Sequence, residues 1–207
     1  MMISSSTPDR LLPGWVRAIF ALWLALAAPA EAARFSTVVI DAGHGGKDKG
    51  AYWGGVRESH LTLQVAQRLE QLLKKKGLRT AMTRRSDTFV SLGSRVAIAN
   101  RYRSSVFVSI HFNACTDRRY RGAETFYAGP AGRKIAQAIQ RRLAPRLKTN
   151  NRGVKQRSFK VLRLTASPAV LVECGFLSNT AERGRCRTAS YQQTAAQAIC
   201  DGIMASR

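Results

Sequence analysis

Phe35-Ser-Thr-Val-Val-Ile-Asp-Ala-Gly-His-Gly-Gly46 sets the fold class of this 207-residue chain. Its first half is a short β-branched run and its second half is rich in glycine, which indicates a buried strand that ends in a tight loop. Loops at strand ends often carry chemistry. Further strands are predicted at residues 78–83, 105–110, 123–128 and 169–172.

Helical patterns alternate with these strands. Apolar residues recur at three- and four-residue steps in 61–76 and 132–147, and Gly77 stops the first of these helices. Segments 92–102 and 191–204 also follow helical periodicity. The βαβαβ order predicts an α/β fold, with a mainly parallel twisted sheet of about six strands covered by helices on both faces. No repeat or long linker divides residues 34–207, so a single domain is expected there.

The first 32 residues are typical of an export signal. Arg10 and Arg17 flank the start of an apolar run at 18–28, and small residues follow it, so cleavage is expected between Ala30 and Ala33. The run is shorter than the roughly 20 residues that a spanning helix needs, so no stable membrane span is expected after signal removal. We therefore predict an exported protein, located in the periplasm or otherwise extracellular or associated with the cell wall.

The chain is strongly basic, with 34 Lys and Arg, 12 Asp and Glu, and a formal net charge of +22. This charge stays on the mature domain, because the first 32 residues contain equal numbers of acidic and basic side chains. A basic domain favours an anionic partner, either nucleic acid or the acidic polymers and lipids of a cell envelope. The export signal and the lack of an aromatic-basic recognition motif favour the envelope over nucleic acid.

The cysteines allow one or two disulfides, since their number is even and the expected compartment is oxidising. Spacing does not define a pairing, and buried free thiols are the alternative. No C-x-x-C motif supports a thiolate zinc site. The four cysteines are Cys115, Cys174, Cys186 and Cys200.

Two of the three histidines, His44 and His111, each follow the end of a predicted buried strand. The ends of parallel strands lie side by side, and two imidazoles with one carboxylate hold zinc while leaving a fourth position for water. Glu58, just ahead of the first helix, is the candidate carboxylate. Each residue also has a structural interpretation, since a first-turn acid is favoured by the helix dipole.

Glu173 ends the apolar run that begins at Pro168. Burial at this position is expected to raise its proton affinity, as a general base near neutral pH requires. The alternative is an ion pair with one of the many basic residues.

These residues lie in motifs that resemble the zinc-dependent N-acetylmuramoyl-L-alanine amidases of bacterial cell-wall remodelling, whose fold is similar to that of the zinc exopeptidases. The resemblance implies that His44, Glu58 and His111 bind Zn²⁺ and that Glu173 is the catalytic glutamate. It also implies a peptidoglycan substrate, cut between the muramoyl lactyl group and L-alanine. The matching segments, spread over residues 37–204, are 39–51, Glu58, Thr83-Arg84 with Asp87, Leu92 with Arg95, Ala99-Asn100, 109–114 and 171–179.

Some positions depart from the usual sequence of that family. Ala42 and Lys49 stand where proline is common, and Ser59-His60 replace a lysine and another polar residue. None of these changes removes a proposed ligand or the base. His60 is expected to be a solvated helix residue, because the resemblance places no ligand there.

Asp41 and Asn113 flank the two ligand histidines in sequence. They are expected to orient the imidazoles or to contact substrate, as polar groups next to metal ligands often do. For Asp41, stabilisation of the glycine turn is the alternative.

The implied activity is amide hydrolysis by zinc-activated water, with the glutamate as general base. Alternatives are a zinc peptidase that cuts within the stem peptide, because the same chemistry serves any amide, and a catalytically silent wall-binding protein. The stretch between 122–128 and the helix near Gly132 leaves no room for the blocking helix that some relatives insert. Activity without an activator protein is therefore expected.

Overall fold

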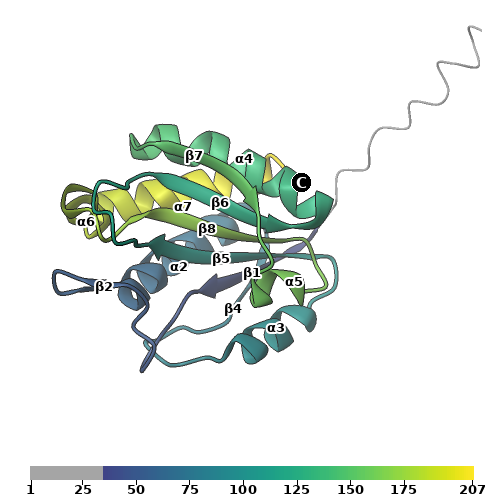
Figure 1. Cartoon of the computed structure of the whole chain (residues 1–207). Coiled ribbons are helices and arrows are strands. Elements are labelled where there is room, and N and C mark those ends of the chain that lie inside the picture. Colours follow the sequence, from purple (N-terminus) through teal and green to yellow (C-terminus); the bar gives the residue numbers. More distant parts are fainter. Residues whose placement is uncertain (1–34) are drawn as a thin grey trace, which may run out of the picture. The chain divides into compact units, whose positions relative to one another are not determined.

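The apolar strand segments pair into one central sheet (Figure 1). The computed structural model describes residues 35–207, so the expected export signal lies outside the described residues. The strands are β1 (Thr37–Ala42), β4 (Arg79–Met82), β5 (Ser105–Asn113), β6 (Ala123–Ala128), β7 (Asn151–Gln156) and β8 (Ala169–Phe176). Their order across the sheet is β4-β1-β5-β8-β6-β7, and only the β6–β8 pair is antiparallel. The predicted six-stranded, mainly parallel sheet is confirmed.

Strand β1 is buried on both faces, which explains its continuous apolar run. Successive side chains of a strand point to opposite faces. Val38 and Ile40 therefore belong to the core on one side of the sheet, and Val39 belongs to the core on the other side.

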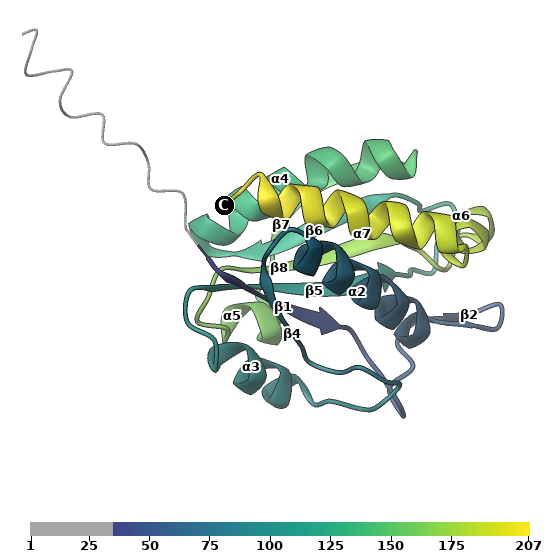
Figure 2. The same ribbon diagram turned by 180° about the vertical axis from the view of Figure 1, so that it is seen from behind.

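Helices cover both faces of the sheet, as predicted (Figures 1 and 2). One face is covered by α2 (Glu58–Lys75), α4 (Gly129–Leu147) and α7 (Ala189–Met204), and the other by α3 (Leu92–Asn100) and the short α5 (Lys160–Arg163). Leu61, Val65 and Leu69 recur every fourth residue of α2 and are buried against the sheet. Within residues 35–207, no helix has the length and apolar character needed to cross a bilayer.

Several short elements are absent from the sequence prediction. They are the hairpin of β2 (Tyr52–Trp53) and β3 (Val56–Arg57), strand β7, and helices α5 and α6 (Thr180–Cys186). Strand β7 lacks an apolar pattern because it is a half-buried edge strand that joins the sheet through backbone pairing with β6. Strands β5 and β8 also run further than predicted, so His111 and Glu173 lie inside strands rather than after them.

All four cysteines are free thiols in the structure, and three of them are buried. The buried thiols Cys174, Cys186 and Cys200 belong to the core on the α2, α4 and α7 side of the sheet. The structure thus favours the alternative of buried thiols over the disulfides that the even count allows.

Candidate metal centre and active site

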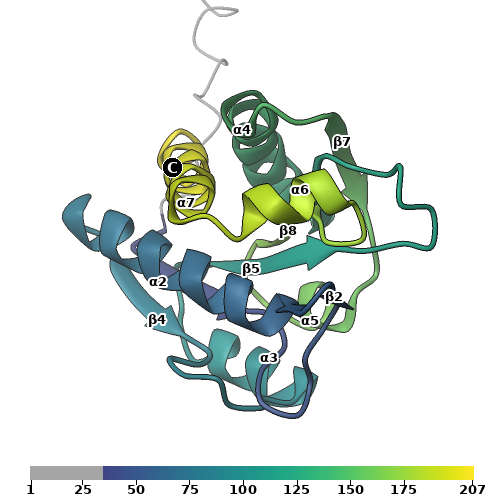
Figure 3. The same ribbon diagram turned by 90° about the vertical axis from the view of Figure 1, so that its left-hand side faces the viewer.

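The candidate site lies at the carboxyl ends of the parallel strands β1, β5 and β8, which are neighbours in the sheet. Figure 3 labels β5 and β8. His44 is two residues after the end of β1, and His111 lies near the end of β5. Glu173 lies on β8, directly opposite His111 in the β5–β8 pair. Strand ends of this kind are the usual location of binding sites in open α/β sheets. The structure therefore gathers residues that are far apart in the sequence.

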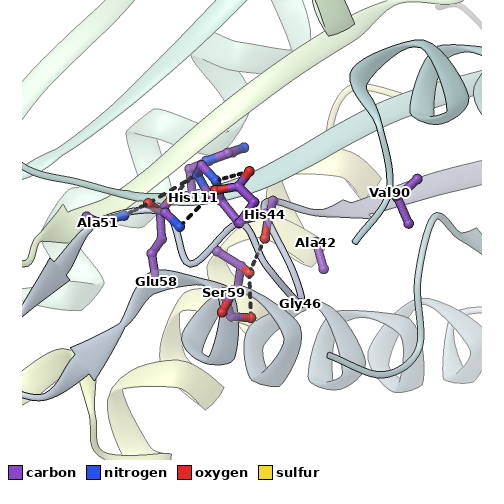
Figure 4. Close-up of polar contacts among 12 residues, drawn as sticks. Ala42, His44, Gly46, Ala51, Glu58, Ser59, Val90 and His111 are labelled. Atoms are coloured by element: carbon purple, nitrogen blue, oxygen red, sulfur yellow. Dashed lines mark hydrogen bonds and ion pairs between the residues drawn. The ribbon is translucent and has the colours of Figure 1, made fainter. Parts of the chain in front are cut away.

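His44, Glu58 and His111 form a compact cluster whose ligand atoms all lie within 4.8 Å of one another (Figure 4). The carboxylate of Glu58 bridges the two imidazoles, with Oε2 3.2 Å from His44 Nε2 and Oε1 2.8 Å from His111 Nδ1. The same carboxylate accepts hydrogen bonds from the backbone N–H groups of Ala51 at 2.8 Å and Phe112 at 3.1 Å. These contacts fix the orientation of Glu58, which is only 5% exposed.

This cluster fits a zinc ion. Donor atoms about 2.0–2.1 Å from zinc in a tetrahedron lie roughly 3.3 Å from each other. The separations of 3.2 Å and 2.8 Å between the imidazole nitrogens and Glu58 are close to that spacing. Two imidazoles and one carboxylate are also the donor set of zinc hydrolases that keep a fourth position for water. Within residues 35–207 this is the one His, Cys, Asp and Glu cluster with such geometry.

The glycine loop after β1 allows the backbone to approach the ligands closely. A Cβ atom on Gly43 would lie 2.3 Å from the His111 ring, and one on Gly50 would lie 2.5 Å from Glu58 Oε2. Gly50 also has a φ of +63°, and His44 itself has a φ of +60°, which side-chain-bearing residues adopt rarely. The loop can therefore pass this close to His111 and Glu58 only with glycine at positions 43 and 50.

Asp48 orients His44, a role that sequence reasoning missed. Its Oδ2 atom lies 2.9 Å from His44 Nδ1, on the ring nitrogen opposite the one that faces Glu58. Burial lowers the pKa of His44, but the carboxylates of Glu58 and Asp48 outweigh it, so this pKa lies above its ordinary value. The only feature of the sequence that indicates this contact is the four-residue spacing between His44 and Asp48 in a glycine-rich loop.

We expect Asp48→Asn to weaken zinc binding by about 10- to 100-fold, because loss of an orienting carboxylate has that effect at metal sites. Competition with a chromophoric chelator measures the affinity. Asp117→Asn is the matched control, since Asp117 pairs with the exposed Arg119 away from the cluster. Equal zinc affinity in the two variants would contradict the role of Asp48.

Asp41 anchors the loop instead of contacting an imidazole. It is buried and accepts hydrogen bonds from Thr83 Oγ1 at 2.6 Å, Ser109 Oγ at 2.7 Å and Arg95 Nη1 at 2.6 Å. Burial raises the pKa of Asp41, but the charge of Arg95 and the hydrogen bonds outweigh it, so this pKa lies below its ordinary value. The observed contacts correspond to the structural alternative, stabilisation of the turn.

Two buried arginines hold the backbone of the same loop. Arg95 donates to the carbonyl oxygens of Ala42 and His44, both at 2.7 Å. Arg84 donates to the carbonyl oxygens of Ala42 and Gly43, both at 2.9 Å. The segment that carries His44 is thus fixed by charge-assisted hydrogen bonds.

Arg95→Met is expected to lower the free energy of unfolding by about 3–5 kcal/mol, since it leaves the Asp41 carboxylate buried without its cation. Urea denaturation measures the loss. Adding Asp41→Asn to this variant removes the unpaired charge, so part of the loss should be recovered. A loss below about 1 kcal/mol, as for exposed ion pairs, would contradict this account.

Asn113 also contacts a carboxylate rather than an imidazole. Its Nδ2 atom donates to Glu124 Oε1 at 2.8 Å, and Glu124 is ion-paired with Lys155 of strand β7. Glu124 lies opposite Glu173 in the antiparallel β6–β8 pair. Asn113 therefore belongs to a polar group beside the candidate base.

Glu173 lies in the same cavity as His44 and His111. Its Oε2 atom is buried and has no hydrogen-bond partner within the described residues. Burial, followed by the negative charges of Glu58 and Glu124, raises the pKa of Glu173 well above its ordinary value. A cation bound beside Glu58 would counter part of this effect, because it offsets a neighbouring negative charge.

The cavity has a volume of about 420 Å³ and continues from these residues between apolar walls. Phe89, Leu92 and Phe159 line it, and all three side chains are partly exposed. His60 does not line the cavity. Its side chain is half exposed and pairs with Asp87 at 3.1 Å.

Sequence comparisons agree on one family. The model of the family described as N-acetylmuramoyl-L-alanine amidase matches residues 38–205. An uncharacterized protein of Bacillus subtilis, YqiI, is 39% identical over 193 residues, which covers 90% of this chain and 93% of YqiI. The N-acetylmuramoyl-L-alanine amidase LytC of the same organism is 37% identical over 172 residues, which covers 81% of this chain and 35% of LytC. The chain thus spans only about a third of LytC.

Solved structures show the same fold. The catalytic domain of CwlV, an N-acetylmuramoyl-L-alanine amidase from Bacillus (Paenibacillus) polymyxa var. colistinus, aligns with a TM-score of 0.80 at 38% identity, covering 83% of this chain and 97% of that domain. The CwlD amidase of Clostridioides difficile, solved in complex with the GerS lipoprotein, aligns with a TM-score of 0.79 at 33% identity, covering 83% of this chain and 98% of CwlD.

Proposed function

Because this chain belongs to the N-acetylmuramoyl-L-alanine amidase family, we propose that it is a zinc-dependent hydrolase of peptidoglycan. The bond cut joins the lactyl group of N-acetylmuramic acid to L-alanine of the stem peptide. The observation that carries the proposal is the convergence of His44, Glu58 and His111 within 4.8 Å, next to a carboxylate on the neighbouring strand.

In this proposal the cluster supplies the metal site and Glu173 moves the proton. A zinc ion held by His44, Glu58 and His111 would lower the pKa of a water molecule to about 7 and polarise the amide carbonyl. Glu173 accepts a proton from the attacking water and delivers it to the leaving amine. Asp48 keeps the His44 ring in place, and the Arg84 and Arg95 contacts keep its backbone in place.

The cavity indicates where the peptide side of the substrate lies. The amine must come close to Glu173, because that residue returns the proton to it. Leu171, which is two residues before Glu173 on β8, lines the same cavity, as do Phe159 and Lys160. In this proposal a small apolar side chain of the peptide packs against Leu171 and Phe159, and a carboxylate further along the peptide complements the charge of Lys160.

Mass spectrometry of the products formed from purified muropeptides tests the function. We expect intact stem peptides and glycans without peptide, with activity lost on chelation and restored by zinc. Shortened stem peptides would identify a zinc peptidase instead. Tight binding to sacculi without any product under saturating zinc would identify a wall-binding protein.

We further propose that the protein acts outside the cytoplasm, most simply in the periplasm. The export pattern of residues 10–33 and the location of the substrate support this placement. A fusion to alkaline phosphatase, which is active only after export, tests it. An inactive fusion in cells that express the full-length protein would contradict export.

We expect the purified protein to hydrolyse muropeptides without an activator protein. His44, His111 and Glu173 line one cavity, and β6 continues directly into α4 without an inserted segment. Steady-state kinetics of the protein alone measure this. Activity that appears only after addition of a second protein from the cell envelope would show that the site is blocked.

A further inference from the structure

A basic cleft lies at the end of the domain opposite the catalytic cavity. At this end the parallel strands β1, β4 and β5 begin (Figure 1). It has a volume of about 680 Å³ and lies between the start of β4, the end of α2 and the segment that follows α3. We call it the basal cleft. Its lining includes Lys74, Arg79, Arg101, Tyr102 and Arg103.

Most of the positive charge of the basal cleft is not paired with a carboxylate of the described residues. No acidic residue lines it. Lys74 approaches Glu70 Oε1 at 3.3 Å, but that carboxylate also accepts two shorter hydrogen bonds from Arg85. Arg79 donates to the neutral Ser36 Oγ at 2.9 Å. Within residues 35–207, no carboxylate pairs with Arg79, Arg101 or Arg103.

These arginines differ from the ones near the active site. Arg84 and Arg95 are buried and bind loop carbonyls or Asp41, so the fold itself explains them. The cations of the basal cleft are exposed and lie together around one hollow. Like charges that gather in this way raise the local positive potential, which an anionic partner relieves.

The position of the basal cleft indicates the kind of anion. The described chain starts at Phe35, at this same end, where Arg207 Nε donates to the Phe35 carbonyl oxygen at 3.1 Å. Only residues 29–34 separate Phe35 from the apolar run at 18–28, a distance of at most about 25 Å when extended. Until its expected removal, a segment with the pattern of an export signal is therefore attached to the basic end.

We propose that the basal cleft docks on the phosphate-bearing headgroups of an anionic bilayer. Basic side chains gain free energy near such a surface, and an exposed aromatic ring next to them suits the headgroup region. Tyr102 is 38% exposed at the cleft, and Lys75 and Lys76, at the end of α2, are also exposed. Docking in this orientation turns the catalytic edge away from the bilayer and toward the wall.

Vesicle co-sedimentation of the processed protein (residues 34–207) tests the proposal, since both sides of the core lie within 35–207. We expect binding to vesicles that contain phosphatidylglycerol, weakening as salt rises, and no binding to phosphatidylcholine alone. The triple variant Arg79→Gln, Arg101→Gln and Arg103→Gln should bind about 100-fold more weakly, at about fivefold per charge. Its hydrolysis of soluble muropeptides should equal that of the unmodified protein, which shows that it is folded.

The matched control removes the same charge from the C-terminal part of α4 and the end of α6, with Arg141→Gln, Lys148→Gln and Arg187→Gln at exposed positions. This control should bind vesicles within about twofold of the unmodified protein. Equal weakening of both variants would overturn the proposal in favour of diffuse charge attraction. If the triple variant of the basal cleft lost binding to sacculi but kept its binding to vesicles, the partner would be a wall polymer, and the proposal of bilayer docking would be overturned. The binding readout needs no turnover, so it stands apart from the proposed amidase activity.

Discussion

Glu173→Gln is expected to lower kcat for muropeptide hydrolysis by about 10²- to 10⁴-fold, the range that general acid–base catalysis contributes. Glutamine has nearly the same shape as glutamate but does not accept and return a proton. The variant is expected to keep the proposed zinc ligands in place, because Glu173 shares no hydrogen bond with His44, Glu58 or His111. Steady-state kinetics and zinc content, measured on the same preparation, check both parts.

This variant is also expected to be at least as stable as the unmodified protein. Burial and two neighbouring carboxylates oppose the negative charge of Glu173, so a neutral side chain removes a cost in the folded state. Glu70→Gln serves as control, since it removes another largely buried carboxylate, one bound to Arg85 away from the cavity. A Glu173→Gln enzyme that retains more than about a tenth of the activity would exclude Glu173 as the base.

The residues that sequence reasoning placed well are those whose positions follow from the strand pattern. Continuous apolar runs predicted β1, β5 and β8, and parallel strands necessarily bring their carboxyl ends together. The meeting of His44 and His111 follows from this topology. The position of Glu58 is harder to predict. Its approach to the two histidines depends on the short β2–β3 hairpin, which turns the chain back toward them.

Other site contacts could not be predicted from the sequence, because they depend on long-range or loop geometry that no local sequence pattern encodes. Asp48 reaches His44 only because the glycine loop takes positive φ values around both residues. Arg95 reaches Asp41 across 54 residues, and Glu124 approaches Glu173 through an antiparallel pairing that the βαβ order does not predict. Proximity in sequence to the histidines predicts that Asp41 and Asn113 contact the imidazoles, but their side chains contact other partners.

His111→Ala is expected to weaken zinc binding by about 10²- to 10³-fold and to reduce activity to background at stoichiometric zinc. Complete zinc sites in small proteins are worth about 10–16 kcal/mol, so one of four ligands accounts for several kcal/mol. The variant is a cleaner test than a change at Glu58, whose carboxylate also holds the backbone N–H groups of Ala51 and Phe112. Removing His111 leaves both of those hydrogen bonds in place.

Excess zinc separates a lost ligand from a lost orienting group. Asp48→Asn retains all three donor atoms, so raising the zinc concentration should restore most of its activity. His111→Ala lacks a donor, and even a refilled site would hold the ion with altered geometry, so its activity should stay low. His60→Ala is the control, because His60 is half exposed and faces Asp87. Full zinc occupancy and activity in His111→Ala would show that the cluster is not the metal site, whatever the products of the reaction.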